Sequence, residues 1–358
     1  MLNISLCMIV KNEQQNLMRC LESVRSIVSE IIVVDTGSTD KTKEIASLFG
    51  AQVIDYTWND DFSAARNVAI EGALGEWVLV LDADEYVVNV NTSMLQAFFL
   101  NNKLSQIGTI EIQSRFLQGD IENTAVHHIS RLFPAGISYT GRIHEQLNTN
   151  LPRVSTGIVL KHEGYYETNK AERNLRLLHK ALEADPGDNY YLFQIARQYR
   201  GCSQSERALN YIEKCYSTLN GQEAYAAEAG IEYLYILMEN RRLQEAVSVI
   251  QKQHTFLENM ADYYLVCGLI YTKIGMDQIV DAISYVPLIE QCYLKCLSLG
   301  KKGGREIVKG TATFIAAYNL GAFYEAKGDI IRAKYNYRRS AEYGYDPATN
   351  RLKELEKL

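Results

Sequence analysis

The clearest indication of the fold is the stretch Glu76-Trp77-Val78-Leu79-Val80-Leu81-Asp82-Ala83-Asp84. It is a continuous apolar run between acidic residues, which is typical of a strand buried on both faces of a parallel sheet. Carboxylates at the end of such a strand do not contribute to the apolar core, so their presence indicates that they bind a ligand. Because ligands of parallel sheets bind beyond the carboxyl ends of the strands, Asp82 and Asp84 are candidate binding residues.

The segments that precede this strand include further short apolar runs, separated by helical patterns. Short apolar runs cover residues 4–10, 30–35 and 51–56, and helical patterns cover residues 13–28, 41–49 and 62–73. Strand–helix alternation at this spacing predicts an α/β fold, with a Rossmann-like, mostly parallel sheet and helices on its faces. Two more strands are expected at residues 108–116 and 157–161.

Strand alternation stops near residue 170, and helical periodicity rich in Ala, Tyr, Leu and Gly follows. Leu320-Gly321-x-x-Tyr324, with Ala333 and Tyr337 after it, fits the tetratricopeptide repeat of about 34 residues. Weaker copies lie around residues 195–212, 232–250 and 268–275. We therefore expect an α/β domain at residues 1–168 and an all-α, tetratricopeptide-like domain at residues 169–358, in which most tyrosines pack between helix pairs.

Composition narrows the class of protein. The 358 residues are 47% apolar and 22% charged, as in an ordinary globular chain, and the net charge of −6 disfavours wrapping of nucleic acid. No apolar run is long enough to span a bilayer and no basic leader precedes the first one, so we expect a cytoplasmic protein. The seven cysteines include no Cys-x-x-Cys and are interpreted as reduced, mostly buried thiols.

The pair Asp82 and Asp84 suits a divalent cation. Two carboxylates two residues apart can reach one Mg²⁺ or Mn²⁺, or one cation and a ribose, and such cations commonly share their ligands with substrate phosphates. The alternative is a solvated acidic loop. Because neither a P-loop nor a Gly-x-Gly-x-x-Gly segment is present, we expect a metal rather than a glycine cradle to neutralise phosphates.

Four segments carry a resemblance when they are taken in order: residues 8–13 (MIVKNE), 30–40 (EIIVVDTGSTD), 58–67 (WNDDFSAARN) and 81–85 (LDADE). Together they resemble family 2 glycosyltransferases of the GT-A fold. The resemblance continues with Arg131-Leu132-Phe133, with residues 139–145 and with His162-x-Gly164-Tyr165. The helical repeats that follow are similar in arrangement to those of peptide S-glycosyltransferases within that family.

The resemblance implies an inverting, metal-dependent hexosyltransferase that uses a UDP-sugar. It implies that the nucleotide sugar is bound at Val10, Asn12, Glu13, Asp35, Arg66, Asp82 and Ala83, with Glu13 and Asp35 on the ribose and base. It also implies Asp82 and Asp84 as ligands of Mg²⁺ or Mn²⁺, with His162 as the third ligand and His144 in reserve. Simpler alternatives are a first-turn acid for Glu13, turn chemistry for Asp35 and a surface ion pair for Arg66.

Transfer to a hydroxyl also requires a general base. Glu145 is the candidate, with His144 beside it, because both follow the turn-like Tyr139-Thr140-Gly141. A lone histidine is as often a hydrogen-bonded structural residue. If the acceptor is a cysteine the base matters less, since a thiol of pKa about 8.5 is partly ionised at neutral pH.

Three interpretations of the whole chain stay open. In the first, the enzyme modifies a peptide or protein side chain that the helical repeats help to hold. In the second, the acceptor is a cell-surface glycan or a lipid-linked molecule, and the repeats form a homodimer. In the third, the chain is a non-enzymatic repeat scaffold with a relic catalytic domain; the intact acidic residues argue against it.

Overall fold

The computed structural model describes residues 3–101, 104–118, 121–163, 169–252, 255–277 and 282–357. The chain divides into two compact units, each described by itself below. The first contains Met1–Gln118 and Thr124–Ala184, and the second contains Gly119–Asn123 and Asp185–Leu358. An α/β sheet flanked by helices is followed by a helical domain, so the predicted fold class is confirmed. The boundary expected at residues 168/169 adjoins residues 164–168, outside the described residues, and stays a prediction.

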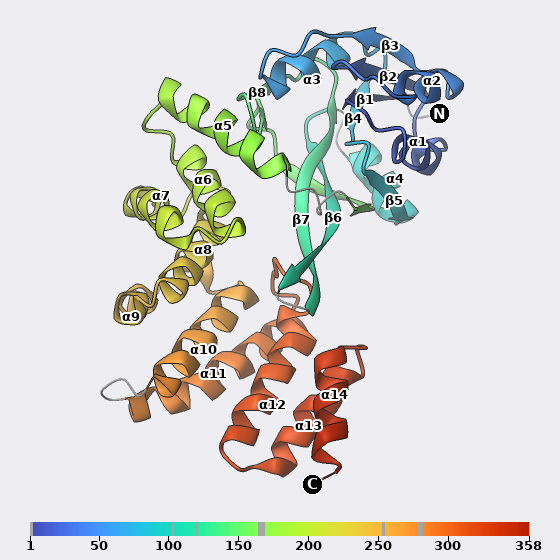
Figure 1. Ribbon diagram of the computed structural model, residues 1–358. Coiled ribbons are helices and arrows are strands. Elements are labelled where there is room, and N and C mark those ends of the chain that lie inside the picture. Colours follow the sequence, from blue (N-terminus) through green and yellow to red (C-terminus); the bar gives the residue numbers. More distant parts are fainter. Residues whose placement is uncertain are drawn as a thin grey trace. The chain divides into compact units, whose positions relative to one another are not determined.

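The first unit is built on a mixed, mostly parallel sheet of eight strands in the order β3-β2-β1-β4-β7-β6-β10-β5 (Figure 1). Its strands are β1 (Ile4–Val10), β2 (Glu30–Asp35), β3 (Gln52–Asp55), β4 (Trp77–Val80), β5 (Glu85–Val90), β6 (Ile107–Gln118), β7 (Ile121–Pro134) and β10 (Arg153–His162). The six strands expected from the sequence are all present, with ends shifted by up to four residues. The strands β5 and β7 were not expected.

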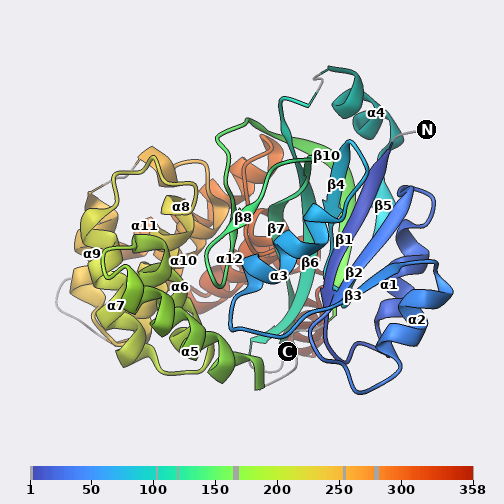
Figure 2. The same cartoon turned by 90° about the horizontal axis from the view of Figure 1, so that it is seen from above.

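Helices cover the sheet on both faces because residues of β1 alternate in direction. Ile4, Leu6 and Met8 pack with α1 (Leu17–Val24), whereas Cys7 packs with α3 (Phe62–Glu71) on the opposite face. Figure 2 shows α3 on one side of the central strands and α1 on the other. The remaining helices of this unit are α2 (Thr42–Leu48), α4 (Thr92–Asn101) and α5 (Asn169–Ala184).

The register brings the ends of the central strands to one edge. Val10 at the end of β1 pairs with Asp35 at the end of β2. Cys7 pairs with Val80, so that the chain after β4 leaves the sheet at the same edge. The parallel arrangement therefore collects the polar residues that follow β1, β2 and β4 at the edge where ligands of such sheets bind.

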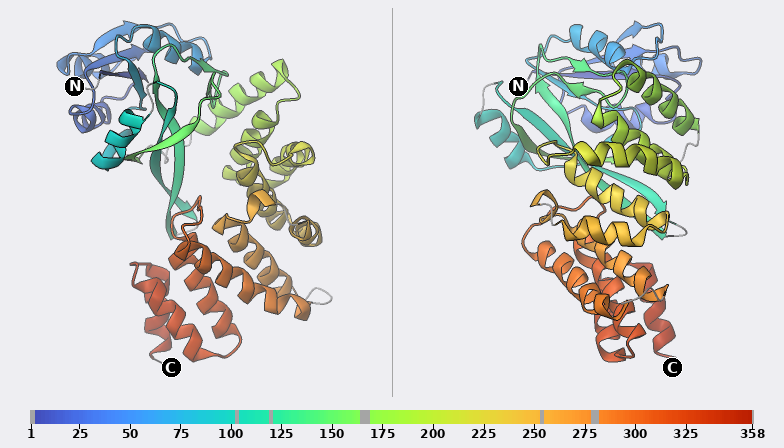
Figure 3. Two further views of the ribbon diagram at one scale, coloured as in Figure 1. Left: turned by 180° about the vertical axis from the view of Figure 1, so that it is seen from behind. Right: turned by 90° about the vertical axis from the view of Figure 1, so that its left-hand side faces the viewer.

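The second unit consists of helices joined by short loops (Figure 3). They are α6 (Asn189–Gly201), α7 (Ser205–Thr218), α8 (Ala226–Glu239), α9 (Leu243–Gln251), α10 (Ala261–Met276), α11 (Ala282–Lys301), α12 (Ala316–Ala326), α13 (Ile330–Ala341) and α14 (Asp346–Leu355), with a π-helix at Thr311–Ile315. The expected small residues lie where helices approach closely. A Cβ atom added to Gly268 would lie 2.5 Å from the ring of Tyr293, and one added to Gly321 would lie 2.8 Å from Tyr337.

All seven cysteines are free thiols, and five of them are buried. Burial raises the pKa of the Cys7 thiol to about 12, so this thiol stays protonated and unreactive at neutral pH. A search of the described residues finds no helix with the length and apolar character needed to cross a bilayer.

Candidate functional site

The carboxylate of Asp35 lies at the end of β2 and is buried. Its Oδ1 accepts hydrogen bonds from the backbone N–H groups of Gly37 (2.9 Å) and Ser38 (2.8 Å). Gly37 has a φ of +105°, a conformation that glycine adopts without strain. The second carboxylate oxygen of Asp35, Oδ2, is also buried but accepts no hydrogen bond from the described residues. A buried acceptor without a donor is costly, so this oxygen is suited to a ligand's N–H or O–H group.

The segment after β1 is tied to the turn after β2. The N–H of Asn12 donates to Ser38 Oγ at 2.8 Å, and the side-chain oxygen Oδ1 of Asn12 accepts from the N–H of Thr39 at 2.8 Å. The N–H of Glu13 donates to Thr42 Oγ1 at 2.7 Å. These contacts hold the two predicted nucleotide-binding residues Asn12 and Glu13 beside Asp35, at the same edge of the sheet.

A network of charged side chains lies beyond the end of β4. Asp82 Oδ1 accepts from Arg66 Nη2 at 2.8 Å, and its Oδ2 accepts from Arg131 Nη2 at 2.8 Å. Arg131 also donates to Glu85 at 3.1 Å, and Arg66 Nε donates to Glu145. The two arginines come from α3 and β7, so strands and a helix far apart in sequence meet here.

Both guanidinium groups in this network are more than nine-tenths buried, at 8% and 9% side-chain exposure. Burial by itself would raise the pKa of Asp82, but Arg131 and Arg66 lower it well below its ordinary value. Burial raises the pKa of Glu85, against the opposing effect of Arg131. Arg66 Nη1 and Arg131 Nε are buried and donate to none of the described residues. The arrangement keeps Asp82 ionised and leaves two buried donors.

Asp84 meets His162, which ends β10, at the same edge. The two side chains contact through Asp84 Oδ2 and His162 Nε2 at 3.2 Å, and His162 Nδ1 lies 3.2 Å from Ser114 Oγ of β6. Burial would lower the pKa of His162, but the hydrogen bond and charge of Asp84 raise it above its ordinary value. A carboxylate from the turn after β4 and an imidazole from the end of β10 therefore face each other.

This pair is the part of the predicted metal-binding set that fits a cation. No group of three or more His, Cys, Asp or Glu side chains that could hold a metal is found in the described ranges. The predicted set Asp82, Asp84 and His162 stays a prediction: Asp84 contacts His162, while the two oxygens of Asp82 accept from Arg66 and Arg131. Asp84 and His162 do fit Mg²⁺ or Mn²⁺, since such ions use one or two protein ligands and complete their shell with water and substrate phosphates.

Glu145 and His144 lie in the turn of a two-stranded hairpin, between β8 (Tyr139–Thr140) and β9 (Gln146–Leu147). The side chain of Asn67 in α3 holds this hairpin by accepting from the N–H of Tyr139 (2.8 Å) and donating to its carbonyl (3.0 Å). His144 has a φ of +51°. The hairpin brings Glu145 to Arg66, so the candidate base belongs to the charged network.

The structure thus brings most predicted site residues to one edge of the sheet. Val10 is buried, and its carbonyl accepts from the N–H (2.9 Å) and hydroxyl (3.0 Å) of Thr36; Ala83 is buried between Asp82 and Asp84. Arg131 and Glu85 were not predicted as site residues. Both lie inside segments that carry the family resemblance. A charged residue next to apolar ones, such as Arg131 before Leu132 and Phe133, is the sequence signal that could have indicated a site residue.

Comparison with known proteins agrees with this geometry. Residues 5–147 match the family model of glycosyl transferase family 2. The chain is 30% identical over 240 residues to the SPbeta prophage-derived glycosyltransferase SunS of Bacillus subtilis, covering 61% of this chain and 54% of that protein. It is 56% identical over 88 residues to a TPR repeat-containing protein of Synechococcus elongatus, covering 25% of this chain and 22% of that protein.

The chain therefore spans about half the length of SunS and about a fifth of the cyanobacterial protein. Among solved structures, the chain is similar to the MamA protein, at 20% identity and a TM-score of 0.38. That likeness covers 49% of this chain and 82% of MamA.

Proposed function

We propose, from the match of residues 5–147 to the family model of glycosyl transferase family 2, that this protein transfers a sugar from a UDP-sugar to an acceptor. The observation that carries the proposal is the gathering of complementary groups at one edge of the sheet. There, a buried carboxylate with a spare acceptor lies at the end of β2, two buried arginines come from α3 and β7, and Asp84 after β4 meets His162 at the end of β10.

The donor would bind along this edge. Oδ2 of Asp35 would accept a hydrogen bond from the base or ribose, beside Val10, Asn12 and Glu13. Arg66 would offer its spare Nη1 to an anionic oxygen of the nucleotide. Asp82 and Ala83 would border the ribose. Because Asp82 is bonded to both arginines, its main contribution is to hold those cations in place.

Asp84 and His162 would hold Mg²⁺ or Mn²⁺, which supplies positive charge for the departing diphosphate. Glu145 would take the proton from the acceptor. The acceptor oxygen or sulfur then forms a bond to the anomeric carbon from the face opposite the leaving group. The bond between that carbon and the UDP oxygen breaks, and its electron pair leaves with UDP. One such displacement inverts the configuration at the anomeric carbon.

We propose a peptide or protein side chain as the acceptor, held partly by the helical repeats, in the cytoplasm. The similarity to SunS and the short catalytic segment support this choice, since the proposed domain at residues 1–168 is occupied largely by the donor side. The division into a catalytic domain at 1–168 and a repeat domain at 169–358 is part of the same proposal. A glycan or lipid-linked acceptor, with the repeats forming a homodimer, has no specific observation in its favour.

The test is titration of the full chain with UDP in the presence and absence of Mn²⁺. We expect UDP to bind with Mn²⁺ and to bind at least tenfold more weakly without it, because charge-assisted contacts to the diphosphate would be lost. The change Asp84→Asn should remove the effect of Mn²⁺. Asp55→Asn is the matched control, since Asp55 is exposed and pairs with Lys43 at 3.0 Å. Absence of UDP binding, or an Asp84→Asn variant that behaves like wild type, contradicts the proposal.

A further inference from the structure

Two polar residues, Ser114 of β6 and His162 of β10, end an apolar row on one face of the sheet. On this face Ile110 and Ile112 of β6 and Leu160 of β10 belong to the hydrophobic core of the first unit. Ile112 pairs with Leu160, and two residues further along Ser114 pairs with His162. Because side chains alternate along a strand, the polar pair continues the apolar row. A buried serine in such a row contributes little to packing, which directs attention to its hydroxyl group.

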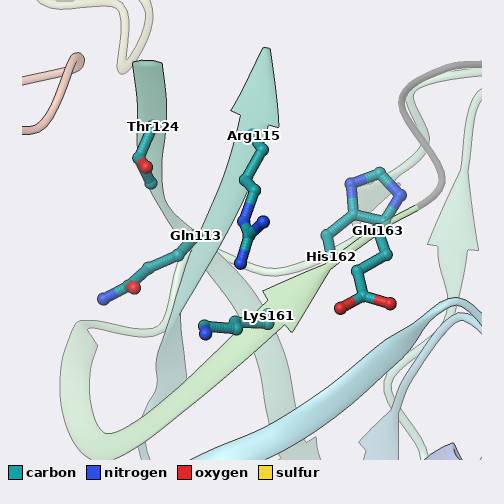
Figure 4. A pocket seen from close by; sticks show the side chains of 6 residues that line it. All are labelled: Gln113, Arg115, Thr124, Lys161, His162 and Glu163. Atoms are coloured by element: carbon teal, nitrogen blue, oxygen red, sulfur yellow. The ribbon is translucent and has the colours of Figure 1, made fainter. Parts of the chain in front are cut away.

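The hydroxyl of Ser114 contacts the imidazole of His162. Ser114 Oγ lies 3.2 Å from His162 Nδ1, and the other ring nitrogen, Nε2, lies 3.2 Å from Asp84 Oδ2. Ser114 is only 3% exposed. Figure 4 shows His162 at the edge of a small pocket together with Gln113 and Arg115, the chain neighbours of Ser114. The imidazole is therefore held at both nitrogens, by a buried hydroxyl and by a carboxylate.

The contact with Ser114 determines how the imidazole can meet a cation. A cation binds a ring nitrogen that carries no proton, so binding at Nε2 requires the proton to be on Nδ1. Ser114 Oγ is placed to accept a hydrogen bond from Nδ1–H. A hydroxyl can also donate, so the contact is kept when the proton is on Nε2 and faces Asp84. The hydroxyl of Ser114 thus holds the ring in one orientation for both positions of the proton.

The two groups that would face the cation are suitably spaced. Neighbouring ligands of an octahedral ion, each at about 2.0–2.1 Å from it, lie about 3 Å apart. Asp84 Oδ2 and His162 Nε2 are 3.2 Å apart. Histidine ligands of metals are usually oriented through the ring nitrogen that does not bind the metal. Ser114 supplies that contact from β6, a strand that is hydrogen-bonded to β10.

We propose that Ser114 is a positioning residue of the cation site, whose hydroxyl orients the ring of His162 so that Nε2 faces the cation beside Asp84. The inference rests on the proposed function for the presence of Mg²⁺ or Mn²⁺, and it adds a residue to that site. Ser114 acts through His162: it contacts neither the donor nor the acceptor and takes no part in proton transfer between them.

The first experiment measures the affinity of the full chain for Mn²⁺ in the presence of UDP, by electron paramagnetic resonance of the unbound ion. We expect Ser114→Ala to bind Mn²⁺ about 10- to 100-fold more weakly than wild type, the usual loss when the partner of a metal-binding histidine is removed. Ser114→Thr keeps the hydroxyl and should restore most of the affinity. The matched control is Ser340→Ala, since Ser340 is buried in the second unit and donates to the carbonyl of Phe314 at 2.8 Å.

Three outcomes of this titration would overturn the inference. The first is equal Mn²⁺ affinity in wild type and Ser114→Ala. The second is an equal loss in Ser114→Ala and Ser114→Thr, because the hydroxyl would then not be the group that matters. The third is a loss in Ser340→Ala as large as that in Ser114→Ala, which would show a general effect of removing a buried hydroxyl.

A spectroscopic measurement tests the orientation of the ring itself. In the full chain with isotope-labelled histidine, saturated with Mg²⁺ and UDP, nuclear magnetic resonance should show the ring proton of His162 on Nδ1. The variant His162→Gln identifies the signal. We expect this proton to exchange slowly with water in wild type and Ser114→Thr, and too fast for detection in Ser114→Ala, where its acceptor is missing. A ring proton on Nε2 in the Mg²⁺-loaded wild type would contradict the inference.

Failure of this inference differs from failure of the proposed function. If UDP and Mn²⁺ bind wild type and Ser114→Ala alike, the positioning role of Ser114 is wrong and the proposed function stands. If wild type does not bind UDP, with or without Mn²⁺, the proposed function is wrong and the positioning role is wrong with it.

Discussion

Asp82 is bonded on both carboxylate oxygens by arginines that are themselves buried, at 2.8 Å in each case. Removing one member of a buried ion-pair network leaves the other charges without compensation, and this costs more than the pair contributes. We expect the loss of Arg131 to cost more stability than the loss of Arg66, because Arg131 also donates to Glu85, whose side chain is 4% exposed. At the scale of single residues, the site is therefore also a determinant of stability.

We predict that Arg131→Met lowers the free energy of unfolding by about 3–5 kcal/mol, since the buried Glu85 loses the cation that it is paired with. Urea unfolding of the full chain measures this. The matched control is Arg176→Met, whose side chain is 56% exposed and which should cost less than about 1 kcal/mol. Equal losses in the two variants would contradict the buried network.

Asp262 at the start of α10 is a second buried acid, with 3% exposure. It accepts from the N–H groups of Ile307 (2.7 Å) and Val308 (3.0 Å) and from the hydroxyl of Thr311 (3.2 Å). Burial raises its pKa from 3.8 to about 6, even though these hydrogen bonds oppose the change. Through these hydrogen bonds, the side chain of Asp262 holds residues 307–311 against the start of α10.

A raised carboxylate pKa means that the folded chain holds the proton more tightly than the unfolded chain. The contribution of Asp262 to stability is therefore present below about pH 4 and is lost as the pH rises to about 6. We predict that this loss is roughly 3 kcal/mol, at 1.36 kcal/mol for each pKa unit. Unfolding at pH 4.5 and pH 7 should show a smaller pH dependence in Asp262→Asn than in wild type. An unchanged pH dependence would refute the assignment.

At the scale of elements, the loop before α3 is joined to α5. Asp60, with a φ of +64°, accepts from Arg176 through two nitrogens at 2.8 and 2.9 Å and from the indole of Trp58 at 3.2 Å. The next residue, Asp61, caps α3 by accepting from the N–H of Ala64 at 3.0 Å. Since α3 carries Arg66, α5 helps to hold the start of the helix that carries a site residue.

We predict that Asp60→Asn changes global stability by less than about 1 kcal/mol, because the ion pair is partly exposed. It should nonetheless lower donor hydrolysis or transfer by about two- to tenfold, through small displacements of Arg66. Arg176→Met should have the same effect, and the double variant should be no worse than either single variant. Additive losses would mean that the two residues act separately. Asp55→Asn serves as the surface control.

At the scale of the whole molecule, every residue assigned to the donor lies in the first compact unit, and the repeats form the second. Gly268 lies deep in the second unit, where a Cβ atom would come within 2.5 Å of Tyr293 Cε1 and 2.8 Å of its Cζ. Tyr293 is fully buried and cannot move without disturbing its neighbours.

We predict that Gly268→Ala destabilises the protein by about 1–3 kcal/mol through overpacking. The affinity for UDP with Mn²⁺ should stay within twofold of wild type, measured at a temperature well below unfolding. Gly201→Ala, at a helical glycine with open space around its Cα, is the control for stability. A large fall in UDP affinity in Gly268→Ala would show that donor binding depends on the packing of the second unit.

Whereas β5 and β7 could not be predicted from the sequence, the alternation of β1 to β4 with α1 to α3 could, because apolar runs and helical spacing are local patterns. The same holds for the acidic residues at strand ends and for the small residues of the repeats. The contacts that shape the site were not legible: Asp82–Arg131, Asp84–His162 and Arg66–Glu145 join residues 49, 78 and 79 positions apart. Periodicity carries no information on which strands become neighbours. Only the sheet order, with β7 beside β4 and β10 beside β5, brings these charges together. A buried charge costs free energy unless it is paired, so the folded chain places these residues in contact.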